Sequence, residues 1–237
     1  MVSLEKENIV DFNGILDNYI ENKSSSHEFE RDEGIHASAI GYCLRKQFYD
    51  ITNPIKPTKE VKRIFEVGNI FHRYFTKILE QSDKVSSVQS EQKIKILVEP
   101  PGFVIHGTYD DLVRLKDNKV ILLDKKTMKN LYYIEKPDKK HLMQLHLYMK
   151  SAGVNDGQLT YIGKNSLEVK NFAVKFDEKI YKEAIERAKM LYKFLKKKNE
   201  LPPAEAREIQ EDKWQCEYCS YNLRCSLNRF GEDDEKK

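Results

Sequence analysis

The chain has 237 residues, of which 40% are hydrophobic and 33% are charged, and its formal net charge is +3. This length can form one sizeable core or two small ones. The net charge is too small to indicate a nucleic-acid binder by itself, and no apolar run is long enough to cross a membrane.

Two further features bear on location and chemistry. The first fourteen residues include acidic side chains and lack the apolar stretch of a signal peptide, so we expect an intracellular, cytoplasmic protein. In a reducing compartment, clustered cysteines indicate a metal site or catalysis rather than disulfides. Of the four cysteines, Cys43 stands alone and three lie within residues 216–225, CEYCSYNLRC.

The N-terminal third predicts helices. Residues 4–21 carry apolar residues at helical spacing, and the polar run that follows predicts a loop. Residues 36–50 predict a short second helix, and residues 59–80 predict the clearest one. The apolar face of that clearest helix is expected to contain Val61, Phe65, Gly68, His72, Phe75 and Leu79.

Strand-like alternation replaces this pattern further along the chain. The predicted elements are strands at 93–98, 103–115 and 119–127, a helix at 138–152, strands at 157–162 and 168–176, and a helix at 177–199. This order, with no obvious linker, predicts a single mixed α/β domain spanning residues 1–237.

Two aspartates at or near the ends of apolar strands form the first candidate site. Adjacent antiparallel strands would bring Asp110 and Asp124 together, and a close carboxylate pair is usually held by a divalent cation. Lys126 shares a strand face with Asp124 and could orient an attacking water. The ordinary alternative is a pair of surface residues near a hairpin.

Other residues add weaker signals. His72 on an apolar helical face is more often a hydrogen-bonded core residue than a ligand. Gln144 and Tyr148 share one helix face, where both are usually structural. Gly107 in a strand can admit a close approach.

Taken in order, these residues resemble the PD-(D/E)xK nuclease superfamily in its RecB-like branch. The cysteines, with Arg45, Lys46 and Tyr49 after the first of them, make the chain similar to the CRISPR-associated RecB-like exonucleases (the fourth core family). The AddB-type helicase-nuclease subunit has the same cysteine arrangement. The resemblance covers residues 36–228.

The resemblance implies a restriction-endonuclease-like α/β core, a mixed central sheet flanked by helices. Segments at the two ends of the chain would be joined by an iron–sulfur cluster. The implied organisation is an extension at 1–35, a first cluster-ligand segment at 36–58, a nuclease core at 59–200, and the cysteine cluster with an acidic tail at 201–237.

The resemblance also implies catalytic roles. His72, Asp110 and Asp124 would bind Mg²⁺ or Mn²⁺, with the backbone carbonyl of Lys125 as a further ligand. Lys126 would position and activate the nucleophilic water. Asp124 stands where many relatives carry the longer Glu, so metal position or preference would differ.

Around this centre, Gln144 and Tyr148 would orient Lys126 or the DNA backbone. The implied ligands of a four-iron–four-sulfur cluster are Cys43, Cys216, Cys219 and Cys225.

The cysteine spacing alone leaves zinc and an iron–sulfur cluster open, since both accept four cysteines; a redox C-x-x-C fits poorly. The resemblance favours iron–sulfur. Joining Cys43 to Cys216 would close a long loop, with an entropic term of roughly 4.6 kcal/mol plus a constant. We therefore expect the cluster to clamp the two ends of the chain beside the core.

The implied function is a metal-dependent DNA exonuclease acting preferentially on single-stranded DNA ends, in CRISPR spacer acquisition or DNA end processing, with the CRISPR integration complex as a partner. The basic block at 189–198 could meet phosphates. Endonuclease activity and an oligomer stay open. The alternatives are a non-catalytic iron–sulfur DNA-binding subunit of a recombination or repair assembly, and a zinc-bearing structural adaptor.

Overall fold

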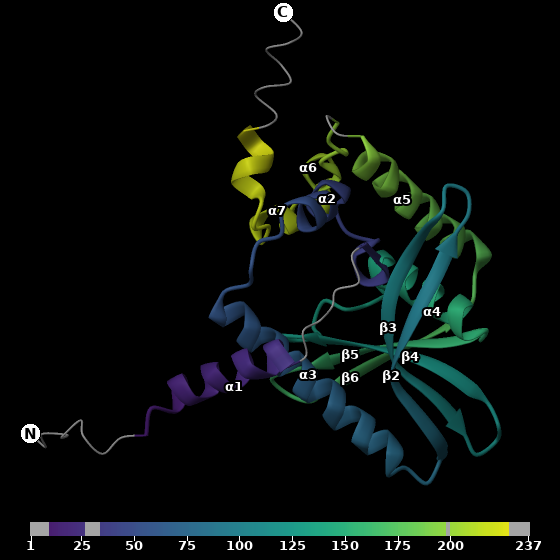
Figure 1. The fold of residues 1–237 in the computed structure, drawn as a ribbon. Coiled ribbons are helices and arrows are strands. Elements are labelled where there is room, and N and C mark those ends of the chain that lie inside the picture. Colours follow the sequence, from purple (N-terminus) through teal and green to yellow (C-terminus); the bar gives the residue numbers. More distant parts are fainter. Residues whose placement is uncertain (1–9, 27–33, 198–199, 228–237) are drawn as a thin grey trace, which may run out of the picture.

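A mixed β-sheet organises the fold in the computed structural model, which describes residues 10–26, 34–197 and 200–227 (Figure 1). Within these residues the sheet has the order β1-β3-β4-β5-β6, and β2 also pairs with β3. The β1–β3 and β4–β5 pairs are parallel and the other pairs are antiparallel. The strands are β1 (Ile35–His36), β2 (Val85–Val98), β3 (Phe103–Leu115), β4 (Val120–Met128), β5 (Asp156–Gly163) and β6 (Val169–Lys175).

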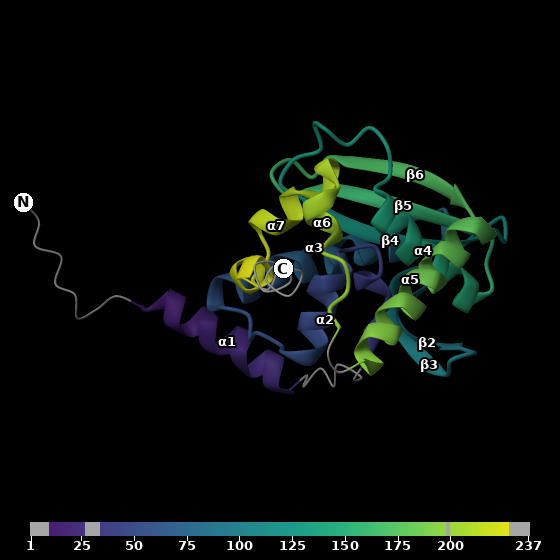
Figure 2. The same cartoon turned by 90° about the horizontal axis from the view of Figure 1, so that it is seen from above.

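Three long helices flank the sheet: α3 (Lys59–Glu80), α4 (Lys139–Ala152) and α5 (Glu178–Lys196). The helices α4 and α5 pack side by side (Figure 2). They lie on one face of the sheet, whereas α3 lies on the other (Figure 1). Side-chain caps set their starts: Thr58 accepts a hydrogen bond from the backbone N–H of Val61, and Asp138 accepts one from Lys140. Gly153 ends α4 in the left-handed conformation that favours glycine.

The main core lies between the sheet and α4. Leu145, Leu147 and Met149 of this helix are fully buried, and they pack against strand residues such as Ile105 and Leu159. Because most of α4 is buried, side chains that it directs at the sheet are held in fixed positions. This makes α4 a rigid support for polar residues at the end of the sheet.

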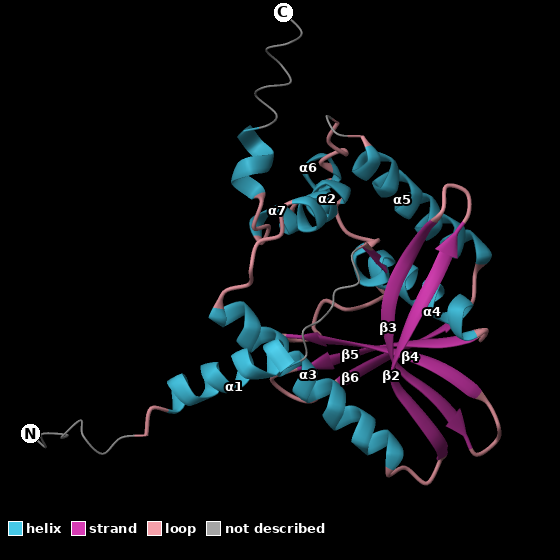
Figure 3. Cartoon of the chain, in the orientation of Figure 1, coloured by secondary structure: helices cyan, strands magenta, loops and turns pink. Residues whose placement is uncertain are grey.

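A smaller group of helices lies apart from the sheet (Figure 3). Its second hydrophobic cluster is centred on Tyr49, Tyr221 and Cys225. These helices and turns are α2 (Leu44–Thr52), α6 (Glu205–Glu208), η3 (Gln210–Asp212) and α7 (Trp214–Glu217), whereas the turn η2 (Ala37–Ala39) packs against β3 and α4 in the main core. The helix α1 (Phe12–Ser26) packs instead against α3, through ion pairs such as Arg63 with Asp17.

Most predicted elements are confirmed, the α3 and α4 helices nearly to the residue. The predicted helix at 36–50 is wrong in its first half, which forms β1 and a 3₁₀ turn before α2 begins. The strand predicted at 93–98 begins earlier, at Val85. The predicted helix at 4–21 corresponds to α1, although residues 1–9 lie outside the described part.

The prediction that one face of α3 is buried is also wrong. No residue of this helix is buried, and Phe65 is 58% exposed. The helix contacts β2, β4 and α1, and these contacts leave its side chains at most partly buried. None of the helices in the described segments combines the length and apolar character needed to span a bilayer.

Candidate active site

The strands β3 and β4 separate at the two predicted aspartates. Their antiparallel pairing ends with Asp111 opposite Leu123, so Asp110 and Asp124 are the next residues in register, where the ladder stops. The backbone N–H of Lys125 donates to Oδ2 of Asp110 at 2.6 Å. Opposed residues share one face of a sheet, so both carboxylates project toward α4.

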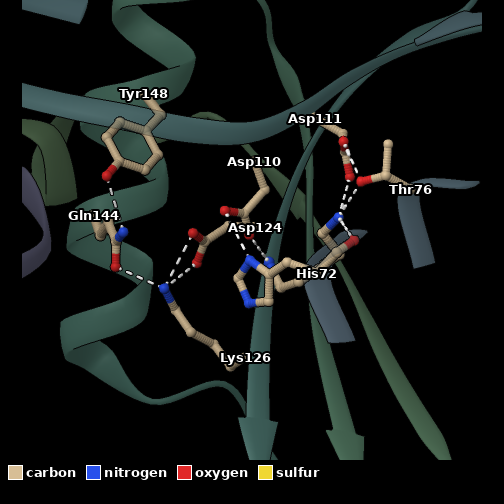
Figure 4. A network of polar contacts seen from close by, with 9 residues as sticks. His72, Thr76, Asp110, Asp111, Asp124, Lys126, Gln144 and Tyr148 are labelled. Carbon is tan, nitrogen blue, oxygen red and sulfur yellow. Dashed lines mark hydrogen bonds and ion pairs between the residues drawn. The ribbon is translucent and has the colours of Figure 1, made fainter. Parts of the chain in front are cut away.

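The structure brings the other predicted residues to the same place (Figure 4). From α3, His72 Nδ1 lies 3.3 Å from Oδ1 of Asp110. Lys126 Nζ lies 2.8 and 3.1 Å from the two carboxylate oxygens of Asp124 and donates to Oε1 of Gln144 at 2.8 Å. These contacts hold the lysine ammonium between a strand carboxylate and a helix amide.

Tyr148 completes the chain of contacts. Its hydroxyl accepts a hydrogen bond from Nε2 of Gln144 at 3.0 Å, which directs the amide oxygen toward Lys126. A Cβ at Gly107 would lie 2.7 Å from the Tyr148 ring. Glycine in β3 therefore admits the close approach of this ring, as the sequence suggested.

A second network lies on the opposite face of the same strands and was missed from the sequence. The ammonium of Lys125 is 2.5 Å from Asp111, and both side chains are almost fully buried. It also donates to Oγ1 of Thr76 at 2.6 Å and to the backbone carbonyl of His72 at 2.9 Å. Strand alternation was the available signal, because it places 111 and 125 on the face away from 110 and 124.

The pKa values of the two aspartates are shifted in opposite directions. Burial raises the pKa of Asp124 to about 6, and the nearby charge of Asp110 adds to this effect against the opposing charge of Lys126. Burial also acts on Asp110, but the hydrogen bond and charge of His72, with Lys126, outweigh it and lower the pKa of that carboxyl. Negative charge at this end of the sheet is therefore concentrated and only partly compensated.

The donor set fits a hard divalent cation. One imidazole and two carboxylates from three elements converge, and such ligands suit Mg²⁺ or Mn²⁺. Oδ2 of Asp124 is buried and makes no hydrogen bond, although Lys126 lies close to it. Among the residues described, however, no group of three or more His, Cys, Asp or Glu side chains is already arranged to hold a metal ion. The ammonium of Lys126 lies 2.8 Å from Oδ2 of Asp124 and so contacts one of these carboxylates directly.

The four cysteines line one pocket, although Cys43 is far from the others in sequence. None forms a disulfide, and Arg207 Nε donates to the sulfur of Cys225 at 3.4 Å. Burial raises the pKa of the Cys216 and Cys219 thiols. Within the described ranges the four cysteines are not already arranged as a group that could hold a metal ion. Four thiols are nevertheless the ligands that zinc or an iron–sulfur cluster accepts.

Hydrogen bonds from neighbouring groups fix the segment that carries Cys43. Its backbone N–H donates to Oε1 of Gln215 at 3.2 Å, and the N–H of Leu44 donates to Glu205 at the same distance. Arg187 on α5 donates to both carboxylate oxygens of Glu205 and to the carbonyl of Tyr42. Protein groups thus join the Cys43 segment to Glu205 and Gln215.

The basic block at 189–198 lies along the C-terminal half of α5 and just beyond it. Lys189 pairs with Glu186, and Lys197 pairs with Glu200. Residue 198 lies outside the described part. Part of the positive charge of the block is therefore already neutralised by neighbouring carboxylates, which weakens the expectation that it meets phosphates.

Comparison with known proteins identifies the family. The model of the PD-(D/E)XK nuclease superfamily matches residues 61–226, well over half of the chain. A solved structure described as SSO0001 has a TM-score of 0.64 and 18% identity, covering 90% of this chain and 94% of that one, and this likeness concerns the fold alone.

Two further solved structures align less closely. An alkaline exonuclease from Laribacter hongkongensis has a TM-score of 0.41 and 12% identity, covering 67% of this chain and 90% of that one. A phage-related exonuclease from Haemophilus somnus 129PT has a TM-score of 0.46 and 12% identity, covering 68% and 94%. A search of curated proteins finds no significant match. On the strength of the family match, this chain belongs to the PD-(D/E)XK nuclease superfamily.

Proposed function

We propose that the chain is a metal-dependent deoxyribonuclease that removes nucleotides from single-stranded DNA ends. The observation that carries this proposal is the convergence of His72, Asp110, Asp124 and Lys126 at the point where β3 and β4 separate. Membership of a nuclease superfamily supports phosphodiester hydrolysis. The exonuclease mode and the preference for single strands follow from the resemblance to RecB-like enzymes.

In this mechanism the two carboxylates and the imidazole would hold Mg²⁺ or Mn²⁺, and the bound cation would supply charge neutralisation on the phosphate and a more acidic water. The carbonyl of Lys125 would be a further ligand; its N–H already fixes Asp110. Lys126 orients the attacking water and stabilises the charge that develops on the phosphate oxygens. Gln144, itself held by Tyr148, sets the position of the ammonium.

We also propose that Cys43, Cys216, Cys219 and Cys225 ligate a four-iron–four-sulfur cluster. Their convergence on one pocket supports a shared site, and the sequence resemblance favours iron–sulfur over zinc. The role would be structural. Absorbance near 400 nm with iron and sulfide analysis tests this assignment, and a colourless protein containing zinc would exclude it. The CRISPR setting, with trimming of DNA before integration, rests on the sequence resemblance alone.

The nuclease proposal is tested with end-labelled single-stranded DNA and either Mn²⁺ or Mg²⁺. The parent is expected to release label, whereas Asp110→Asn and Lys126→Ala are expected to lose activity by at least a hundredfold. Asp117→Asn and Lys116→Ala, at the exposed hairpin turn between β3 and β4, serve as matched controls that keep activity. If the parent binds DNA without cleaving it under either metal, the chain is instead a non-catalytic DNA-binding subunit.

A further inference from the structure

Two tyrosines extend into solvent from the connection between β4 and α4. These elements carry Lys126 and Gln144, so the connection lies beside the candidate active site. Tyr132 is 80% exposed and Tyr133 is 84% exposed. Their ring centroids are 4.8 Å apart and the rings meet edge to face. Such exposure of two adjacent aromatic side chains indicates an interaction surface.

The turn that bears the two rings is firmly held. The N–H of Ile134 donates to the carbonyl of Leu131 at 3.1 Å, and Lys170 on β6 donates to both the Leu131 and Ile134 carbonyls at 3.0 Å. The side chain of Leu131 is 2% exposed and anchors the turn in the core. The tyrosines are therefore displayed from a fixed base, and ordering them on binding costs little.

The charge around the rings favours a polyanion. Lys129 and Lys136 are exposed on the same connection, and Lys164 follows β5 at its end next to β4, where its N–H bonds to Met128. Within the described part of the chain, none of these three lysines forms an ion pair with a carboxylate. The connection also carries Glu135, which is exposed, and Asp138, which pairs with Lys140. Exposed aromatic faces beside free cations match the bases and phosphates of an unpaired nucleic-acid strand.

We propose that Tyr132 and Tyr133 form a stacking platform for unpaired bases next to the bond that is cleaved. Tyr132 is six residues from Lys126, so their Cα atoms are at most about 20 Å apart. Inside a duplex the base faces are covered by their neighbours, so the rings can stack only on unpaired or terminal bases. This inference rests on the proposed function and assigns a physical origin to its preference for single strands.

The test measures binding of a fluorescein-labelled single-stranded oligonucleotide by anisotropy in EDTA, where metal-dependent cleavage does not occur. Tyr132→Ala/Tyr133→Ala is expected to weaken binding by about fivefold to a hundredfold. The double Phe variant should bind like the parent, because it keeps both ring faces. An oligonucleotide with abasic sites in place of all its bases should be bound equally by the parent and the Ala variant. Tyr19→Ala, an exposed tyrosine on α1, is the matched control.

Equal losses on normal and abasic strands, or a loss in the Phe variant equal to that in the Ala variant, would overturn the stacking role. So would unchanged binding of the Ala variant. The slope of log affinity against log salt concentration should be the same for the Ala variant and the parent, because the substitution removes no cationic side chain. A protein that shows base-dependent binding but no cleavage with Mn²⁺ would refute the nuclease proposal and leave the platform standing.

Discussion

Substituting Lys125 should destabilise the protein much more than substituting its neighbour on β4, Lys126. Lys125→Met leaves Asp111 fully buried without its cation, and it also removes hydrogen bonds to Thr76 and to the His72 carbonyl. Breaking a buried ion pair costs about 3–5 kcal/mol. That loss is a third or more of the stability of many domains.

A double variant distinguishes the cost of leaving Asp111 unpaired from the cost of losing the whole ion pair. Asp111→Val/Lys125→Met removes both charges and should recover most of the lost stability, because an apolar replacement of a buried ion pair is often neutral. Lys126→Met should cost less than Lys125→Met, since its partner Asp124 already has a raised pKa and can bind a proton instead.

Urea unfolding followed by circular dichroism measures these differences, with the midpoint reporting stability when the slope is constant. The expected order of stability is parent, double variant, then Lys125→Met. If Lys125→Met unfolds at the same urea concentration as the parent, or if the double variant is no more stable than the single one, the buried pair does not have the assigned role.

Three further predictions follow from the same contacts. Because burial raises the pKa of Asp124 to about 6, this carboxyl binds a proton more readily in the folded metal-free protein than in the unfolded chain between pH 4 and 6, so the contribution of Asp124 to the unfolding free energy falls as pH rises through this window. Asp124→Asn should remove up to about 3 kcal/mol of this penalty, and a pH-independent difference in urea midpoint would contradict the assignment. Gly107→Ala should destabilise the protein by about 1–3 kcal/mol and slow cleavage, because its Cβ displaces the Tyr148 ring; normal cleavage by a destabilised variant would show that Tyr148 does not act through Gln144. Arg207→Met should lower the reduction potential of a bound cluster by removing a cationic N–H donor at the cysteines, and redox titration with an unchanged potential would exclude that influence.

Local patterns predicted the active-site strands well. The relation between Asp124 and Lys126 needs only the two-residue alternation of a strand, and the meeting of Asp110 with Asp124 needs only a hairpin. Helical spacing likewise placed Gln144 and Tyr148 on one face. Each of these inferences concerns residues whose relative positions are set by local geometry.

Tertiary relations were much harder to predict. The helical stripe on α3 correctly directed His72 toward the protein, but periodicity cannot say how completely neighbouring elements cover the helix, and Phe65 is 58% exposed. Composition likewise does not distinguish Lys125 from Lys126, because the difference depends on which sheet face receives α3. The approach of Cys43 to the C-terminal cysteines came from family resemblance, not from any local rule.

The hydrogen bonds around Cys43 reduce the amount by which a cluster bound to the thiols would stabilise the fold. Gln215 and Glu205 already join the first cysteine segment to the last part of the chain, and Arg187 ties both to α5. The entropy of bringing such distant segments together is lost only once. Most of it is therefore offset by ordinary folding, and a bound cluster would act on a loop that is already closed. Its removal should loosen the local helices more than it separates the ends of the chain.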